Sequence, residues 1–134
     1  MQKRIPTELI SYLIMKTIHK EGATYGYELI NELKEISKGH WDPSYGTIYG
    51  ALNRMEKKDF IERVEGDSED RKYYRLTTKG KKELDKKEGD MKEIGKMAQE
   101  NVLGFLCVYR EIYGEDKFRE LMDRVRMEFY LTNI

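Results

Sequence analysis

The chain has 134 residues, of which 39% are hydrophobic and 37% are charged, and its 25 basic and 25 acidic residues give a formal net charge of zero. This length suits one domain, or a small domain with an appendage, and the apolar content excludes a disordered chain. The single cysteine, Cys107, excludes an internal disulfide framework, and with neither an apolar signal segment at residues 1–9 nor an uncharged stretch long enough to cross a bilayer, we expect a cytoplasmic protein without membrane contact.

Two amphipathic helices are predicted at the start of the chain, because apolar residues recur there at helical spacing. The first covers residues 7–20, and its apolar stripe consists of Ile10, Leu13, Ile14, Thr17 and Ile18. Gly22 interrupts this pattern, and Thr24 is expected to be the N-cap of the second helix. The expected buried face of the second helix consists of Tyr25, Leu29, Leu33 and Ile36.

A third helix is predicted over residues 44–58, with Ser44 as its N-cap and Asp59 as the residue that breaks it. Its expected buried face consists of Tyr45, Ile48, Leu52 and Met55. Beyond Asp59 the period shortens, so that residues 60–65 and 72–76 are each predicted to be a strand. The polar, turn-forming stretch between them predicts a β-hairpin.

The rest of the chain is predicted to be helical. Thr77 is expected to cap a long, highly charged helix, and a last helix starts near Lys117. Three helices followed by a hairpin is the order of a winged helix-turn-helix domain, in which the third helix enters the major groove of DNA and the hairpin, or wing, contacts the backbone. We therefore predict a mainly α fold with a two-stranded β-hairpin: a DNA-binding domain over residues 1–80 and a C-terminal helical dimerisation region over 81–134.

The face of the third helix opposite its apolar stripe is the candidate groove-contacting surface. It holds Gly46, Gly50, Asn53 and Lys57, flanked by Thr47, Arg54 and Tyr49. An exposed helical glycine costs ~1 kcal/mol relative to alanine, and close approach of either a phosphate chain or another protein helix would offset that cost. Asn53 can pair with an adenine edge, and Arg54 or Lys57 with guanine or phosphate.

Two further groups of residues are candidates for phosphate contacts. Tyr25 lies where helix-turn-helix proteins contact phosphate, although a core tyrosine is the alternative. Residues 71–87 carry eight basic and two acidic side chains, a local charge of +6, and Arg71 and Lys72 are the candidate wing contacts. The alternative for this run is the solvated face of a helix. The acids of the wing tip are expected to point away from DNA; they are Asp67, Glu69 and Asp70.

Three segments carry a resemblance to a known family. They read YGYELINEL at 25–33, PSYGTIYGALNRMEKKDFIE at 43–62 and EDRKYYRLTTKGKKEL at 69–84. In this order and at these separations they resemble the PadR family of winged-helix transcriptional regulators. The resemblance implies a homodimer joined by its C-terminal helices, in which each subunit presents residues 44–58, Ser44 and Tyr45 included, to a major groove and the 66–71 loop to the flanking backbone.

The C-terminal region supplies a candidate dimer seam. It consists of Leu84, Met91, Ile94, Val102, Phe105 and Leu106. Some members of the family sense aromatic acids or flat drugs, which implies a small aromatic effector as a candidate partner. Its expected contacts are Met97, Phe105, Tyr109, Tyr113 and Phe118. We favour the alternative that these side chains are dimer core, because the only tryptophan, Trp41, lies outside the region where drug-binding members stack their ligand.

Nothing in the sequence supports catalysis or a bound cofactor. His19, His40 and Cys107 are too widely separated for a metal site, and no phosphate-loop pattern occurs. Cys107 lies among Phe105, Leu106 and Val108 and is expected to be a buried hydrophobe. We therefore predict no enzymatic activity, no metal and no cofactor.

The sequence as a whole predicts a sequence-specific DNA-binding regulator of transcription. We expect a repressor that acts as a homodimer on a palindromic operator, because two-fold symmetry places two third helices about 34 Å apart, one turn of DNA. The alternative is a winged-helix protein-interaction module without DNA binding, which the zero net charge and the acidic wing favour.

Overall fold

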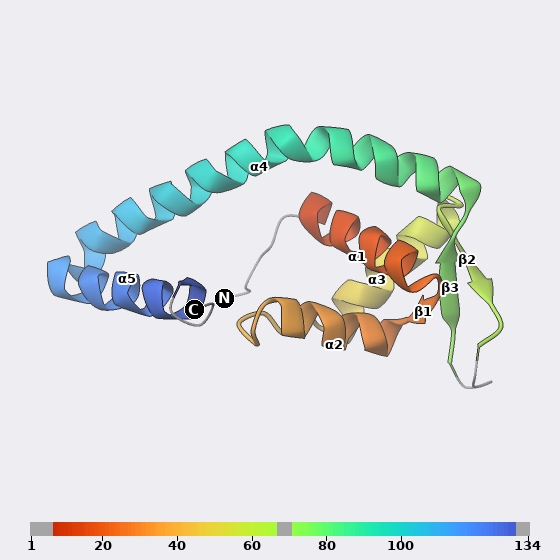
Figure 1. Ribbon diagram of the computed structural model, residues 1–134, viewed down its shortest axis with the longest axis horizontal. Coiled ribbons are helices and arrows are strands. Elements are labelled where there is room, and N and C mark those ends of the chain that lie inside the picture. Colours follow the sequence, from red (N-terminus) through yellow and green to blue (C-terminus); the bar gives the residue numbers. More distant parts are fainter. Residues whose placement is uncertain (1–6, 67–70, 131–134) are drawn as a thin grey trace. The chain divides into compact units, whose positions relative to one another are not determined.

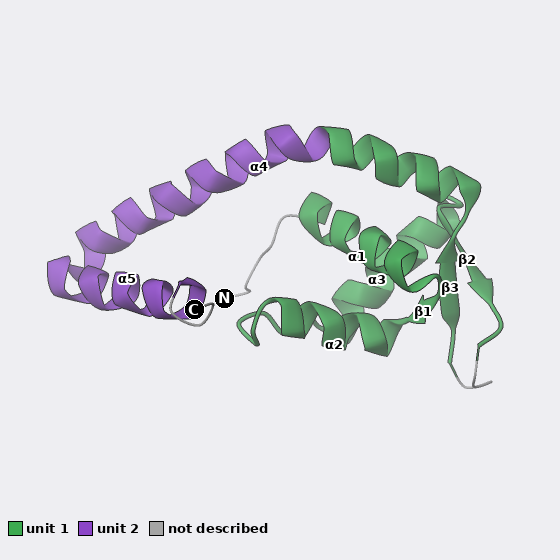
Figure 2. Cartoon of the chain, in the orientation of Figure 1, with its two compact units in different colours: residues 1–89 green, residues 90–134 purple. Residues whose placement is uncertain are grey.

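The computed structural model describes residues 7–66 and 71–130, which form five helices and three strands (Figure 1). Along the chain these are α1 (Thr7–Glu21), β1 (Thr24–Tyr25), α2 (Gly26–Ile36), α3 (Tyr45–Lys57), β2 (Ile61–Val64), β3 (Tyr73–Leu76), α4 (Thr78–Tyr113) and α5 (Glu115–Phe129). The chain divides into two compact units, residues 1–89 and 90–134 (Figure 2). The first unit has the succession of elements predicted for a winged helix-turn-helix domain.

The sheet has three strands rather than the two that the sequence predicts. Its order is β1-β3-β2, and both pairings are antiparallel. Thr24 pairs with Tyr74 and Tyr25 with Tyr73, so Thr24 is not a helix cap. Tyr25 has an extended backbone, with φ −123° and ψ 162°, and itself occupies the N-cap position of α2. The sequence prediction was wrong here because the partner strand lies far away along the chain, where local patterns carry no information about it.

The core of the first unit lies between α1, α2, α3 and one face of the sheet. Its buried apolar side chains are Ile14, Met15, Ile18, Leu29, Ile30, Leu33, Ile48, Ala51, Leu52, Met55, Ile61, Tyr74, Leu76 and Leu84. The predicted helix faces are confirmed at most positions, with two exceptions. Ile36 and Tyr45 are 54% and 58% exposed. Ile36 is the last residue of α2 and Tyr45 the first residue of α3, so both lie beyond the part of the helix that packs on the core.

Two predicted helix caps are confirmed. The Ser44 hydroxyl accepts a hydrogen bond from the Thr47 amide at 3.1 Å and starts α3. The Thr77 hydroxyl accepts one from the Gly80 amide at 2.9 Å and starts α4. Each cap satisfies an amide that the first turn of the helix leaves without a partner.

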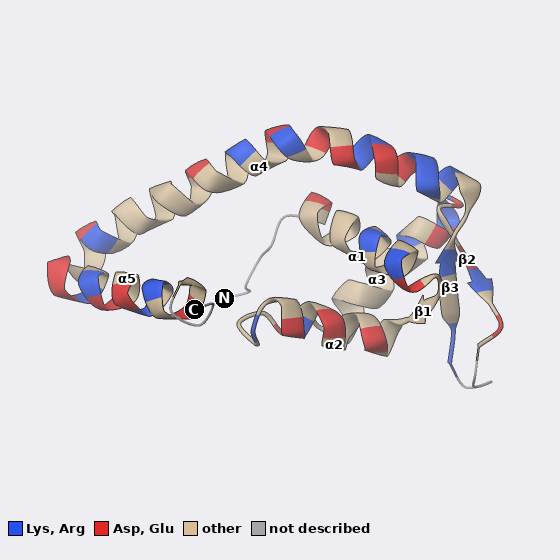
Figure 3. Ribbon diagram, in the orientation of Figure 1, with Lys and Arg blue, Asp and Glu red and all other residues tan. Residues whose placement is uncertain are grey.

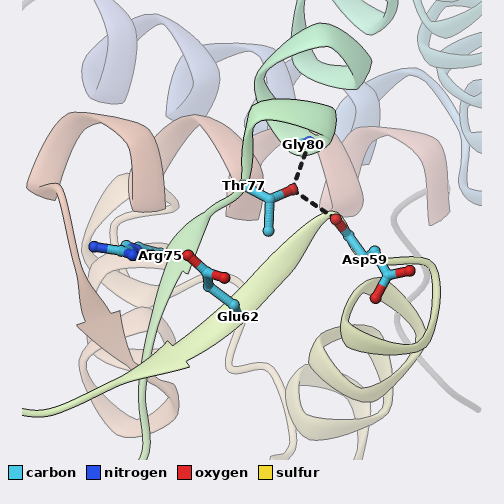
Figure 4. Close-up of polar contacts among 5 residues, drawn as sticks. All are labelled: Asp59, Glu62, Arg75, Thr77 and Gly80. Atoms are coloured by element: carbon cyan, nitrogen blue, oxygen red, sulfur yellow. Dashed lines mark hydrogen bonds and ion pairs between the residues drawn. The ribbon is translucent and has the colours of Figure 1, made fainter.

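The first turn of α4 is also fixed to the end of α3, at a joint shown in Figure 4. The Thr77 hydroxyl donates to the Asp59 carbonyl oxygen at 2.6 Å, and the Thr77 amide donates to the Phe60 carbonyl oxygen at 3.0 Å. Gly80 packs on the same Phe60 carbonyl so closely that a Cβ at this position would lie 1.9 Å from its oxygen. Beside the joint, Arg75 Nε and Glu62 Oε1 pair across β3 and β2 at 2.8 Å.

The boundary between the compact units falls after Gly89, beyond the residue-80 boundary expected from the sequence. The first turns of α4 belong to the winged unit, because Gly80 and Leu84 are buried in it. Leu84 is 4% exposed and lies in the core of its own subunit, so it has little surface left for the dimer seam to which the sequence assigned it.

The second unit is a helical hairpin formed by the rest of α4 and by α5. Gly114, with φ +91°, makes the turn between the helices, and the Arg110 guanidinium lies 5.1 Å from the centre of the Phe118 ring. None of the residues described in this unit is buried. Cys107 is exposed as well, which corrects the expectation of a buried thiol: one partner helix covers only one side of α4.

We predict that Gly80→Ala destabilises the protein by about 1–3 kcal/mol or more, because the new methyl group meets a backbone carbonyl that cannot move alone. Gly89→Ala in the same helix is the matched control, since nothing lies within 4 Å of its added Cβ. Gly89→Ala should increase the free energy of unfolding by up to ~1 kcal/mol, because alanine has a higher helix propensity than glycine. Chemical unfolding at one fixed protein concentration measures both changes, and equal stabilities of the two variants would contradict the packing described for Gly80.

Candidate nucleic-acid interface

The outer face of α3 is open. An ideal Cβ at Gly46 has no atom within 4 Å, and one at Gly50 meets only Arg54 Nη1, at 3.4 Å. Asn53, Arg54 and Lys57 are exposed on the following turns. No other described segment of the chain lies within 4 Å of a Cβ added at Gly46, so within the described residues these glycines do not accommodate a second helix of this chain. Close packing of a helix from another protein stays the alternative to DNA.

The hydroxyl groups at the start of α3 serve the helix itself. The Ser44 hydroxyl is used by the cap, and it also lies 2.9 Å from the Thr47 hydroxyl. Both side chains remain exposed, so each hydroxyl has a solvent-facing side. Ser44 and Thr47 thus stay at the open face as predicted, with their orientation fixed by each other.

Two tyrosines of α3 stack on each other next to this face. The rings of Tyr45 and Tyr49 are 4.8 Å apart and nearly parallel, at 19°. The Tyr49 ring covers Gly26 at the start of α2, where an added Cβ would lie 2.5 Å from Tyr49 Cζ. Burial, together with the neighbouring Tyr45 phenol, raises the pKa of Tyr49 to about 12. Tyr49 therefore joins α2 to α3, while Tyr45 remains at the surface.

A second aromatic pair lies at the base of the wing. Tyr25 of β1 and Tyr73 of β3 have ring centres 5.2 Å apart, tilted at 60°. The Arg71 guanidinium lies over the Tyr25 ring, 4.6 Å from its centre, a distance at which a cation and an aromatic face attract each other. Tyr25 is half-buried between Tyr73 and Arg71, and its contact with phosphate stays a prediction.

These two aromatic pairs meet in one cleft, which we call the tyrosine cleft. It has a volume of about 420 Å³, and its lining residues are Tyr25, Tyr27, Tyr45, Tyr49, Arg71 and Lys72. Five of the six are predicted site residues, drawn from segments far apart in the sequence. Sequence reasoning missed Tyr27, which is 54% exposed on the first turn of α2. In the sequence, Tyr27 is marked only by its place two residues after Tyr25. This spacing puts both tyrosines on one surface only because the chain changes from strand to helix between them.

The basic run after the wing is partly neutralised by ion pairs. Figure 3 shows Lys and Arg along β3 and the first turns of α4, with acidic residues interspersed on the helix. Arg75 pairs with Glu62, and Lys87 lies 4.0 Å from Glu83. Arg71 and Lys72 are exposed and line the tyrosine cleft. The wing-tip acids at 67, 69 and 70 lie outside the described residues.

Over residues 7–66 and 71–130 there is no group of three or more His, Cys, Asp or Glu side chains that could hold a metal ion. Within the same ranges, every helix is too short or too polar to span a bilayer.

Comparison with known proteins identifies the family. Residues 14–86, more than half of the chain, match the model of the family described as "Transcriptional regulator PadR-like family". The chain belongs to this family. PadR-like proteins are regulators of transcription and not enzymes, which confirms the resemblance and the prediction of no enzymatic activity. An uncharacterized protein of Lysinibacillus sphaericus is 40% identical over 76 residues, which cover 52% of this chain and 70% of that protein.

Solved structures of PadR-like regulators share the fold. A PadR family transcription regulator from Clostridium difficile is 33% identical, with a TM-score of 0.53 over 69% of this chain and 97% of that chain. The structure of Bacillus subtilis PadR in complex with operator DNA is 28% identical, with a TM-score of 0.50. The match between the two structures covers 60% of this PadR-like chain and 47% of the Bacillus subtilis chain.

Proposed function

We propose that this PadR-like regulator binds double-stranded DNA sequence-specifically, as a homodimer on a palindromic operator, and represses transcription there. The observation that carries the proposal is the open face of α3, with two glycines and an exposed amide and two exposed cations on its next turns. A helix without side chains at Gly46 and Gly50 can approach base edges closely, and a similar structure, that of Bacillus subtilis PadR, contains operator DNA. Where an operator overlaps a promoter, a protein that binds the operator represses transcription without any further activity.

If α3 contacts the groove, substitutions of Gly50 and Gly89 should have different effects on operator binding. Gly50→Gln should keep the fold, since only the flexible end of Arg54 lies near the new side chain, yet abolish operator binding because the helix can no longer approach the bases. Gly89→Gln on the open side of α4 is the matched control and should bind normally. Asn53→Ala should cost about 1–3 kcal/mol of operator affinity and relax base preference at one position.

Titration of the protein with a duplex from its own promoter region measures these effects, with a scrambled duplex beside it. A folded Gly50→Gln variant that binds as tightly as the parent would contradict the docking of α3. A parent protein that binds no DNA even at low salt would favour the alternative, a winged-helix module for protein interaction.

The wing is expected to contact phosphates through Arg71 and Lys72. Each neutralised phosphate releases counterions, so the Arg71→Ala, Lys72→Ala variant should reduce the slope of log K against log salt by about 1 for each basic residue lost. Lys117→Ala with Arg119→Ala, which removes the same charge from α5, is the control and should leave the slope unchanged. Equal slopes for the parent and the wing variant would remove the wing from the interface.

The second unit supports the homodimer. Its described residues include large apolar side chains that remain more than half exposed, and these are Met97, Val102, Leu103, Phe105, Val108, Ile112, Tyr113, Met127, Phe129 and Tyr130. Phe105, Tyr109 and Tyr113 also pack along α4 with tilted rings, whose centres are 6.2 and 4.6 Å apart. So many exposed apolar side chains are typical of an interface with another copy rather than of a solvated helix. The same aromatic side chains are thereby assigned to the dimer and not to an effector.

We predict that the parent sediments at twice its chain mass of 16.0 kDa at micromolar concentration, and that Phe105→Glu with Ile112→Glu sediments as a monomer. The physical reason is that both side chains, 64% and 67% exposed in one subunit, would leave two charges in the seam. Glu111→Lys, a change at a position that is already charged and lies about 100° around the helix from Ile112, should stay dimeric. Analytical ultracentrifugation decides it, and a parent that remains monomeric while binding a single palindrome tightly would overturn the homodimer.

A further inference from the structure

Insertion of α3 into a DNA groove does not by itself explain the tyrosine cleft. Three elements meet in it: the β1–α2 junction supplies Tyr25 and Tyr27, α3 supplies Tyr45 and Tyr49, and the residues leading into β3 supply Arg71 and Lys72. Its volume of about 420 Å³ is more than ten times the ~30 Å³ that one water molecule occupies in the liquid. The cleft can therefore hold a polyatomic group together with its water.

The chemistry of the lining is that of an anion site. Two cations, Arg71 and Lys72, line the cleft together with four tyrosines. Arg71 is held over the face of Tyr25, and Tyr73 supports that ring from the other strand of the pair. An arginine whose side chain is already positioned loses less conformational entropy when it binds an anion than one that is free in solvent.

The phenols provide neutral hydrogen-bond donors to the same anion. Tyr27 and Tyr45 are 54% and 58% exposed, so their hydroxyls can reach a bound group from solvent. Tyr45 is held by its stack on Tyr49, which in turn packs on Gly26. Neutral donors add hydrogen bonds without the repulsion that a third and fourth cation would add to the pair already present.

We propose that the tyrosine cleft binds one phosphodiester of the DNA backbone beside the groove that receives α3, with Arg71 and Lys72 supplying charge and Tyr27 and Tyr45 donating hydrogen bonds. The proposal rests on the proposed function and deepens it, because it makes the wing contact one part of a clamp built by three elements. A backbone contact of this kind fixes the register of the protein on the duplex and carries no sequence preference. Tyr27, which no sequence pattern marks, becomes a DNA-contacting residue.

The test removes single hydroxyl groups and keeps the rings. Tyr27→Phe and Tyr45→Phe should each weaken binding about 3- to 10-fold, equally for the operator duplex and for a scrambled duplex, so that the ratio of the two affinities stays constant. Tyr12→Phe is the matched control: this tyrosine lies on α1, its hydroxyl donates only to Glu88, at 3.3 Å, among the contacts described, and the variant should bind as the parent does. Melting temperatures equal to that of the parent verify that each variant is folded.

A second measurement locates the phosphate. Replacing the phosphates of the operator one at a time by neutral methylphosphonate should weaken binding of the parent at one position in each half-site beside the groove. The double variant Tyr27→Phe, Tyr45→Phe should lose much less at that same position, because the interaction is already missing. Losses that are equal for the parent and the double variant at every position would overturn the proposal.

The outcomes separate the cleft from the proposed function. If the parent prefers its operator and Asn53→Ala reduces that preference, while both phenylalanine variants bind as Tyr12→Phe does, the cleft proposal is wrong and the function stands. If the parent binds no duplex, the function itself fails, and the cleft proposal fails with it. If the phenylalanine variants change the operator-to-scrambled ratio, these hydroxyls read bases, and the phosphate assignment is overturned.

Discussion

Strand β3 is the element on which the winged unit depends. It pairs with β1 on one side and with β2 on the other, and it places Tyr74 and Leu76, 1% and 6% exposed, in the core beneath α1 to α3. Tyr73 on the same strand supports Tyr25, and Thr77 directly after it starts α4. A four-residue strand thus sets the position of the second helix, the wing and the long helix at once.

The joint that follows β3 explains why the winged unit extends into α4. Thr77 is bonded to the turn that ends α3, and Gly80 leaves no space between α4 and the Phe60 carbonyl. The first turns of α4 therefore cannot tilt without moving the backbone at the end of α3. Beyond Gly89 the helix belongs to a hairpin with no buried residue among those described, and such a hairpin gains too little from burial to be stable without another surface.

A net charge of zero is compatible with this surface because electrostatic attraction acts locally. At physiological ionic strength, charges more than about 8–10 Å apart are largely screened, so the acids on distant helices do not cancel Arg71 and Lys72. Part of the basic run is already paired, as Arg75 is with Glu62. The tyrosine cleft brings Arg71 and Lys72 next to four phenol side chains, so basic and neutral polar groups share one surface without a positive net charge on the whole chain.

The sequence by itself determined the helices, two of their caps and the family. Helical spacing located Ile48, Leu52 and Met55 on the buried face of α3, and the hydroxyl side chains of Ser44 and Thr77 marked two helix starts. These features succeed because periodicity and capping depend on residues within one or two turns. The same helical spacing predicted the opposite face of α3, which holds Gly46 and Asn53.

Only the tertiary structure decided what depends on residues far apart in the chain. The strand β1 exists because β3 offers Thr24 a partner 50 residues later, Tyr74, and Leu84 is a core residue because Gly80 brings α4 onto the winged unit. Tyr27 joins the cleft for the same reason, since the strand–helix junction and the base of the wing meet only in the folded chain. Local patterns carry no information about such partners, because pairing and packing between distant segments are set by the fold as a whole.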